Sequence, residues 1–135
     1  MKELKVKALV ASIPEVTAFI DAQLEEIACP VRAQMHIDLA IDELFANISN
    51  YAYAPGTGDA VVGYEYDEKE RTVSVTFTDS GVPFDPLQNP DPDTSLPAEE
   101  RQIGGLGIMM VKKVMDDVVY RYENGKNILT IRKKL

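Results

Sequence analysis

Glu43 and Asn47 are the first residues whose types and spacing suggest chemistry. They are four residues apart and fall on one face of a predicted helix. A carboxylate there can accept a proton from a hydroxyl group, and an asparagine oxygen can bind Mg²⁺ without adding charge. The structural alternative is the polar side of an amphipathic helix, and the spacing alone favours that alternative.

The tripeptide Asp79-Ser80-Gly81 comes directly after a predicted strand. A carboxylate at a strand end can accept a hydrogen bond from the exocyclic amine of adenine. Gly81 lets a flat ring approach the backbone. The structural alternative is an ordinary turn, for which these three residue types are common.

The segment Gly104-Gly105-Leu106-Gly107 precedes a predicted apolar helix. Glycines allow backbone amides to point at an anion, and the positive end of a helix favours phosphate. A flexible hinge is the alternative. The chain contains no Gly-Lys-Ser/Thr, so a P-loop is excluded. In this order, the three segments indicate a nucleotide site without a Walker motif.

Composition limits the remaining function classes. The 135 residues suggest one domain, and the net charge of −8 opposes binding to nucleic acid or to an anionic membrane. The chain has one cysteine, Cys29, and one histidine, so we expect neither an intrachain disulfide nor a zinc site. No signal peptide or membrane-spanning run is evident, which predicts a cytoplasmic protein.

Periodicity predicts the elements that must position these groups. An alternating segment from Leu4 to Val10 predicts a strand, and Ser12-Ile13-Pro14-Glu15 has the spacing of a capping box before a helix. A second helix is predicted from Pro30 to about Tyr53. The later part of the chain then predicts strands at Val62–Tyr66 and Val73–Phe77, a long loop over 82–102, a helix at Ile108–Met115, and a hairpin of Val118–Glu123 and Lys126–Arg132 around Asn124-Gly125.

The order of these elements, β-α-α-β-β-loop-α-β-β, leaves few parallel crossovers. It predicts an α+β fold, a two-layer sandwich whose mixed, mostly antiparallel sheet is covered on one face by helices. We expect residues 1–135 to form a single domain.

The three chemical segments together resemble the ATP-binding domain of the GHKL superfamily, with the Bergerat fold. More closely, the chain is similar to the stand-alone anti-sigma-factor serine/threonine kinases of bacteria. Glu43-Leu44-Phe45-Ala46-Asn47 resembles the N box, and the run from Asp79 to Pro86 resembles the first glycine box. Gly104-Gly105-Leu106-Gly107-Ile108 resembles the second glycine box, and about 86–103 takes the place of the ATP lid.

The resemblance implies a role for each matching residue, with ATP and Mg²⁺ as the bound groups. Glu43 would be the general base and Asn47 the Mg²⁺ ligand. Asp79 would hold the adenine amine, with Gly81 against the ring. The loop of Gly104, Gly105, Leu106 and Gly107 would bind phosphate, with Gly105 and Gly107 acting through their backbone amides.

The resemblance also implies partners. The substrate would be a serine or threonine of a STAS-type anti-anti-sigma protein, a sigma factor would be a second partner, and the chain would form a homodimer. Two positions depart from the family pattern: Pro83 stands where a second glycine is common, and Tyr51 where a histidine is frequent. A nucleotide-gated binding module that regulates a partner without phosphate transfer is the alternative function.

Overall fold

The structure is a computed structural model that describes residues 1–88 and 105–135. Most of the predicted ATP lid, about 86–103, therefore lies outside the described residues. The elements follow in the order β1 (Lys2–Lys7), η1 (Val10–Ser12), α1 (Ile13–Glu26), α2 (Val31–Tyr51), β2 (Asp59–Asp67), β3 (Thr72–Asp79), η2 (Pro86–Gln88), α3 (Gly105–Val114), β4 (Asp117–Glu123) and β5 (Lys126–Lys134).

The strands form one five-stranded sheet in the order β1-β2-β3-β5-β4. All four pairings are antiparallel, so the predicted α+β fold with a mostly antiparallel sheet is confirmed. None of these pairings is parallel, so the sheet is not mixed. Strand β3 shows why the alternation forms a strand: Val73, Val75 and Phe77 are buried, while the residues between them face the other side.

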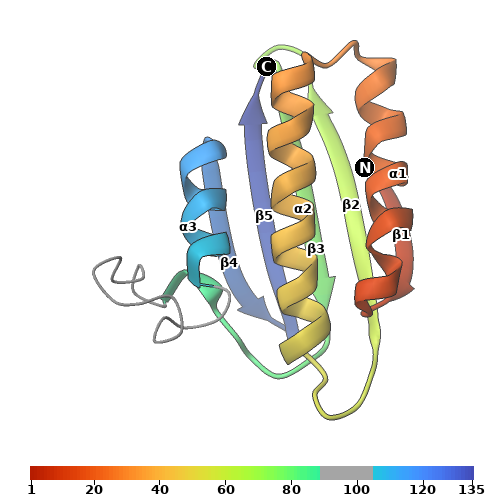
Figure 1. Ribbon diagram of the computed structural model, residues 1–135, viewed down its shortest axis with the longest axis vertical. Coiled ribbons are helices and arrows are strands. Elements are labelled where there is room, and N and C mark those ends of the chain that lie inside the picture. The colour runs from red at the N-terminus through yellow and green to blue at the C-terminus, as the bar shows by residue number, and fades with distance from the viewer. Residues whose placement is uncertain (89–104) are drawn as a thin grey trace.

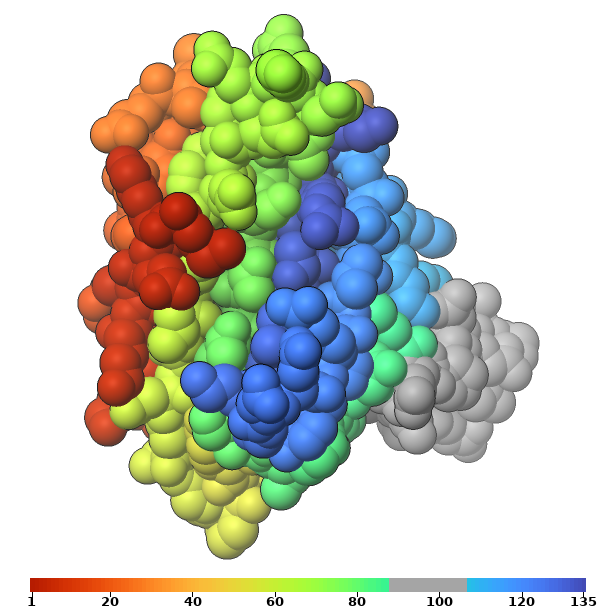
Figure 2. All heavy atoms as spheres, turned by 180° about the vertical axis from the view of Figure 1, so that it is seen from behind, coloured from red at the N-terminus to blue at the C-terminus, as the bar shows by residue number. Residues whose placement is uncertain are grey.

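All three helices cover the same face of the sheet, with α2 over the central strands (Figure 1). Figure 2 shows the opposite face, where no helix lies over the strands. Helix α2 buries Ile37, Ile41, Leu44 and Phe45 against the sheet at helical spacing. This packing fixes which side of α2 its polar residues occupy. No helix within the described ranges is long and apolar enough to cross a membrane.

The chain before α1 differs from the prediction. The first strand ends at Lys7, and Val10–Ser12 forms a 3-10 turn. Ser12 therefore already has helical backbone angles and makes no side-chain capping bond, so the predicted capping box does not form. Pro14 still lies in the first turn of the helix, where its missing N–H costs nothing.

The last two strands form the hairpin that Asn124-Gly125 predicts. Both residues have positive φ, 54° and 76°, as a type I′ turn requires. The turn sets the register that pairs Tyr122 with Asn127 across the hairpin. It also places Asn127 on β5 opposite Asp79 on β3.

Two acidic residues face each other where α1 packs on α2. The Oδ1 atoms of Asp21 and Asp38 are shielded from solvent, and neither accepts a hydrogen bond from the described part of the chain. Burial raises the pKa of Asp38 to about 7, and the hydrogen bond and charge of Asp21 and the charge of Asp42 add to the effect. We therefore expect the two carboxyl groups to share one proton, which would supply a donor for these oxygens.

We expect this pair to make the protein less stable as the pH rises. The folded state holds the proton of Asp38 more tightly than the unfolded chain, whose pKa is 3.8, so the stabilising contribution is complete below pH 3.8 and is lost as the pH rises through about 7. Asp38→Asn should remove about 1 kcal/mol of this pH dependence, an effect kept small by solvent screening. Urea unfolding at about pH 5 and about pH 8 measures it.

Glu25→Gln is the matched control, because Glu25 is exposed on the same helix as Asp21. It should leave the pH dependence unchanged. An Asp38→Asn variant with the wild-type pH dependence would contradict the shared proton.

Candidate active site

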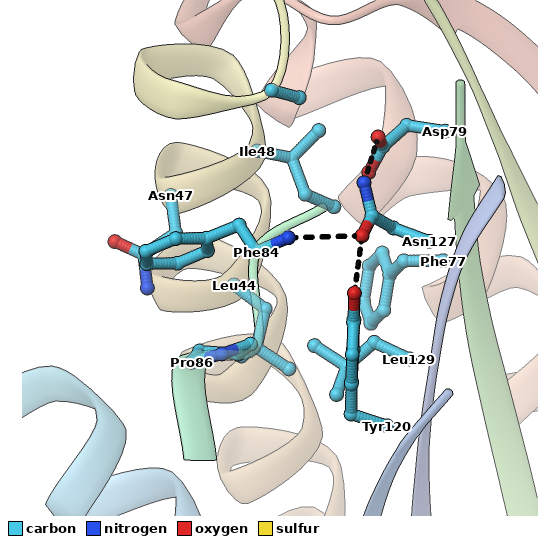
Figure 3. Close-up of a pocket in the computed structure, with 11 residues that line it drawn as sticks. Leu44, Asn47, Ile48, Phe77, Asp79, Phe84, Pro86, Tyr120, Asn127 and Leu129 are labelled. Carbon is cyan, nitrogen blue, oxygen red and sulfur yellow. Dashed lines mark hydrogen bonds between the residues drawn. The ribbon is translucent and has the colours of Figure 1, made fainter. Parts of the chain in front are cut away.

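Two of the predicted site residues, Asn47 and Asp79, line one pocket where the C-terminal half of α2 faces the end of β3 and the start of β5 (Figure 3). Glu43 and Asn47 lie on α2 on the polar side that borders its apolar face, and both are half-buried. The expected shared face is confirmed in the structure. Their chemical roles remain predictions.

Asp79 ends strand β3 and is one of the few buried polar residues, with 5% of its surface exposed. Its Oδ1 atom accepts hydrogen bonds from the Gly81 N–H and from Asn127 Nδ2, both at 2.9 Å. The described bonds of this carboxylate thus go to one oxygen. No described group donates to the other oxygen, Oδ2.

Asn127 is a site residue that the sequence reasoning missed. It is 6% exposed and lies on β5, where its neighbours Leu129 and Ile131 alternate into the core. Besides Asp79, its side chain contacts the backbone of the loop after β3 and the Tyr120 hydroxyl. The pattern that could have identified it is a polar residue at an inward-facing position of β5, where the next two inward-facing residues, Leu129 and Ile131, are apolar.

Tyr53 fixes the loop that begins at Ser80. Its hydroxyl accepts a hydrogen bond from the Ser80 N–H at 2.8 Å and donates one to the Asp59 carbonyl at 2.7 Å. The chain after α2 is thereby tied to the start of β2 and to the end of β3. No local pattern in the sequence indicates this role.

Gly81 packs against the end of α2. A Cβ atom added to Gly81 would overlap the backbone carbonyl of Ala52, and the neighbouring Val82 N–H donates to that carbonyl at 2.9 Å. This contact within the protein accounts for the glycine independently of a ligand. The predicted approach of a flat ring to Gly81 remains a prediction.

Gly107 meets Glu43 across the site. A Cβ atom added to Gly107 would overlap the Glu43 carboxyl group, whose Cγ atom would lie 3.3 Å from it. Gly107 is in the first turn of α3, so the carboxylate of α2 lies at the start of that helix. The first and third chemical segments of the sequence are therefore in direct contact.

Gly107→Ala and Gly81→Ala should separate function from stability. At Gly107 the obstacle is the end of a flexible side chain, so Ala should move Glu43. It should lower the rate of the phosphate transfer that the family resemblance implies about tenfold to 100-fold, while stability changes by less than about 1 kcal/mol. At Gly81 the obstacle is backbone, so Ala should cost about 1–3 kcal/mol of stability. Urea unfolding measures stability, and a transfer assay measures the rate. Equal losses of stability in the two variants would contradict the expected difference between Gly107 and Gly81.

A small apolar cavity lies beside Asp79 and Asn127. Its volume is about 30 Å³, and the lining residues shown in Figure 3 come from α2, β3, β4, β5 and the loop after β3. Ligand pockets usually have volumes of about 300–1,000 Å³. The described lining thus encloses less space than such a pocket.

Ala52, Phe84 and Pro86 are the parts of this lining that belong to no long helix or strand. The Phe84 ring stacks on Tyr51 with ring centres 5.5 Å apart. The rest of the lining belongs mainly to the packed core of α2 and the sheet.

The phosphate loop is described only in part. Gly105, Leu106 and Gly107 begin α3, whereas Gly104 lies outside the described residues. Lys112 and Lys113 are on the exposed side of α3. The backbone N–H groups of residues 105–107 are thus among the first of α3, which have no carbonyl partner within the helix.

The donor set suits an Mg²⁺ ion that arrives with phosphate. Within residues 1–88 and 105–135, no cluster of three His, Cys, Asp or Glu side chains could hold a metal. Asn47 offers one oxygen near Glu43. Mg²⁺ commonly takes its other ligands from substrate phosphates and water, so a single protein ligand fits this mode.

Comparison with known proteins places the chain among nucleotide-binding domains. Residues 6–133 match the family model of the histidine kinase-like ATPase domain. The chain is 30% identical to the serine/threonine-protein kinase BtrW of Bordetella bronchiseptica over 100 residues, which is 74% of this chain and 70% of BtrW. It is 31% identical to the serine-protein kinase RsbW of Listeria monocytogenes over 97 residues, 69% of this chain and 61% of RsbW.

Solved structures agree in fold. The RsbU and RsbW domains of Rv1364c from Mycobacterium tuberculosis superpose with a TM-score of 0.67 and 18% identity, covering all of this chain and 33% of that one. The histidine kinase domain of the blue-light activated histidine kinase EL346 from Erythrobacter litoralis superposes with a TM-score of 0.53 and 15% identity. This match covers 93% of this chain and 60% of that one. At these identities the likeness concerns the fold alone.

Proposed function

This chain belongs to the histidine kinase-like ATPase domain family, in the group of the serine/threonine kinases BtrW and RsbW, and from that premise we propose that it transfers the γ-phosphate of ATP to a serine or threonine of a protein. The observation that carries this proposal is the contact between the Glu43 carboxylate and Gly107. It brings a proton acceptor to the helix start where phosphate would bind.

Glu43 is assigned the chemical step. Its carboxylate accepts the proton of the attacking hydroxyl group, and its half-buried position on α2 limits the directions from which that hydroxyl can approach. Phosphate transfer depends mainly on positioning and on neutralising charge, so a fixed carboxylate beside the phosphate site suits it.

Asp79 is assigned recognition of the base. Its carboxylate is buried at the end of the cavity, and apolar side chains such as Leu44, Phe77 and Leu129 line the space in front of it. An apolar slot that ends in one hydrogen-bond acceptor suits a flat base carrying an amino group. Adenine has this group, which is consistent with ATP as the nucleotide.

Asn47 and the start of α3 are assigned the phosphates. Asn47 would hold Mg²⁺, which neutralises phosphate charge when bound. The backbone amides of Gly105 and Gly107, together with the Gly104 and Leu106 positions of the same loop, would hold the phosphate oxygens.

The partners follow from the family resemblance. The proposed substrate is a STAS-type anti-anti-sigma protein, with a sigma factor as a second partner, a homodimer as the working form and the cytoplasm as the location. The acidic charge of −8 suits a basic protein surface better than nucleic acid.

The test is transfer from γ-labelled ATP to a STAS-type protein encoded beside this chain. We expect Mg²⁺-dependent labelling of that protein and none when its acceptor serine or threonine is replaced by alanine. Absence of labelling, together with partner affinity that differs between ATP and ADP, would overturn the kinase and favour a nucleotide-gated binding module.

A further inference from the structure

The side chain of Asn127 uses every hydrogen-bonding position it has. Its Nδ2 group donates to Asp79 Oδ1 and to the Val82 carbonyl, both at 2.9 Å. Its Oδ1 atom accepts from the Phe84 N–H at 3.1 Å and from the Tyr120 hydroxyl. An amide has two donors and two acceptor positions, so this set is complete.

These partners allow one orientation of the amide. A carboxylate and a carbonyl lie on one side, and both can only accept. A backbone N–H and a hydroxyl lie on the other side. Burial raises the pKa of Tyr120, which keeps its hydroxyl a donor. Turning the amide over would put its oxygen against two acceptors.

The orientation of Asn127 determines what Asp79 can offer to a ligand. Asp79 Oδ1 is filled by the Asn127 amide and the Gly81 N–H. Asp79 lines the cavity, and no described group donates to Oδ2, so this oxygen can accept a hydrogen bond from a ligand. A base with an amino group can donate a hydrogen bond to that oxygen. A base with an oxo group at the same position would place its own acceptor oxygen against Oδ2, and no hydrogen bond could form.

Asn127 also ties this carboxylate to the wall of the cavity. The Val82 carbonyl and the Phe84 N–H belong to the loop whose Phe84 ring stacks on Tyr51. One side chain on β5 therefore holds the end of β3, the loop after it and, through Tyr120, strand β4. All of these contribute residues to the cavity lining.

We propose that Asn127 is a positioning residue that selects for a purine with a 6-amino group by fixing the Asp79 carboxylate as an acceptor. This inference rests on the proposed binding of ATP by the same site. Asn127 acts through Asp79 and is not assigned a contact with the nucleotide.

The test measures the affinity of each variant for two nucleotides by calorimetry with Mg²⁺. One is ATP and the other is the purine triphosphate that lacks only the 6-amino group. The ratio of the two affinities reports the bond to that amino group, and in the wild type it should be about 10- to 100-fold.

In Asn127→Asp, a carboxyl group replaces an amide of the same shape. It must either repel Asp79 or share a proton with it. Both results weaken Asp79 as an acceptor, so the ratio should fall below about threefold. A merely structural role would weaken both nucleotides equally and leave the ratio unchanged.

Asn124→Asp is the matched control. It makes the same chemical change three residues away, at the exposed turn with positive φ, which Asp also tolerates. Its ratio should equal that of the wild type.

Tyr120→Phe covers the case in which Asn127→Asp does not fold. It removes one of the two donors that orient the Asn127 oxygen, from a strand at the sheet edge. The ratio should fall about twofold to fivefold. An unchanged ratio in the folded variants overturns the role of Asn127 while ATP binding stands; a wild type that binds neither nucleotide overturns the proposed function as well.

Discussion

Replacement of Glu43 by glutamine should abolish phosphate transfer while ATP still binds. Gln keeps the shape of the side chain but cannot accept a proton from the attacking hydroxyl group. Loss of a general base lowers rates by about 10²–10⁴-fold, so we expect transfer to fall by at least about 100-fold. A transfer assay and calorimetric binding of ATP with Mg²⁺, made on the same preparation, measure both quantities.

Asp42→Asn is the matched control for this variant. Asp42 precedes Glu43 on α2 and is exposed, so the change removes the same charge one residue away. It should transfer phosphate at the wild-type rate. Normal transfer by Glu43→Gln would remove Glu43 from the chemistry, and an equal loss in both variants would mean that charge on this helix matters rather than the proton acceptor.

Replacement of Asp79 by asparagine should remove nucleotide binding itself. The new amide group must face either the two donors held by Oδ1 or the amino group of the base, so one donor always meets another. Leaving a buried polar group without its partner costs about 1–3 kcal/mol, more for charged groups, and we expect ATP affinity to fall at least about 100-fold. Calorimetry with Mg²⁺ measures the loss.

Asp117→Asn provides the comparison for Asp79. Asp117 makes an exposed ion pair with Arg132 at 3.0 Å on the edge strand, away from the cavity. Exposed pairs contribute little, so its ATP affinity and its stability should match the wild type. An Asp79→Asn protein that is folded by circular dichroism and binds ATP normally would contradict the assignment of base recognition to Asp79.

The contrast between Glu43 and Asp79 divides the site into two tasks. A variant of Asp79 should lose both binding and transfer, whereas a variant of Glu43 should lose transfer alone. The separation matters because a nucleotide-gated binding module needs nucleotide binding but not phosphate transfer. Glu43 therefore distinguishes an enzyme from such a module.

Much of the fold could be predicted because its signals are local. The alternation of Val73, Val75 and Phe77 defines β3 within a few residues, and Asn124-Gly125 defines the hairpin by itself. The capping box failed because a 3-10 turn placed Ser12 in a helical conformation before α1 began. Spacing alone cannot detect such a competing turn.

The site could be predicted only in its separate parts. Each segment could be predicted from its own position at a helix or a strand end, and the helical spacing placed Glu43 and Asn47 on one face. The contacts that join the segments are long-range: Asn127 and Asp79 are 48 positions apart, and Tyr53 and Ser80 are 27 apart. Such partners depend on strand register and packing, which local patterns do not specify.

Strand β5 comes after every other described element in the chain, yet it lies inside the sheet between β3 and β4. While the protein is being made, β3 therefore keeps an open edge until β5 emerges, for several seconds at about 5–20 residues per second. An open strand edge can pair with other chains. In the same interval Asp79 has no Asn127 beside it, so the proposed site for the base cannot yet form.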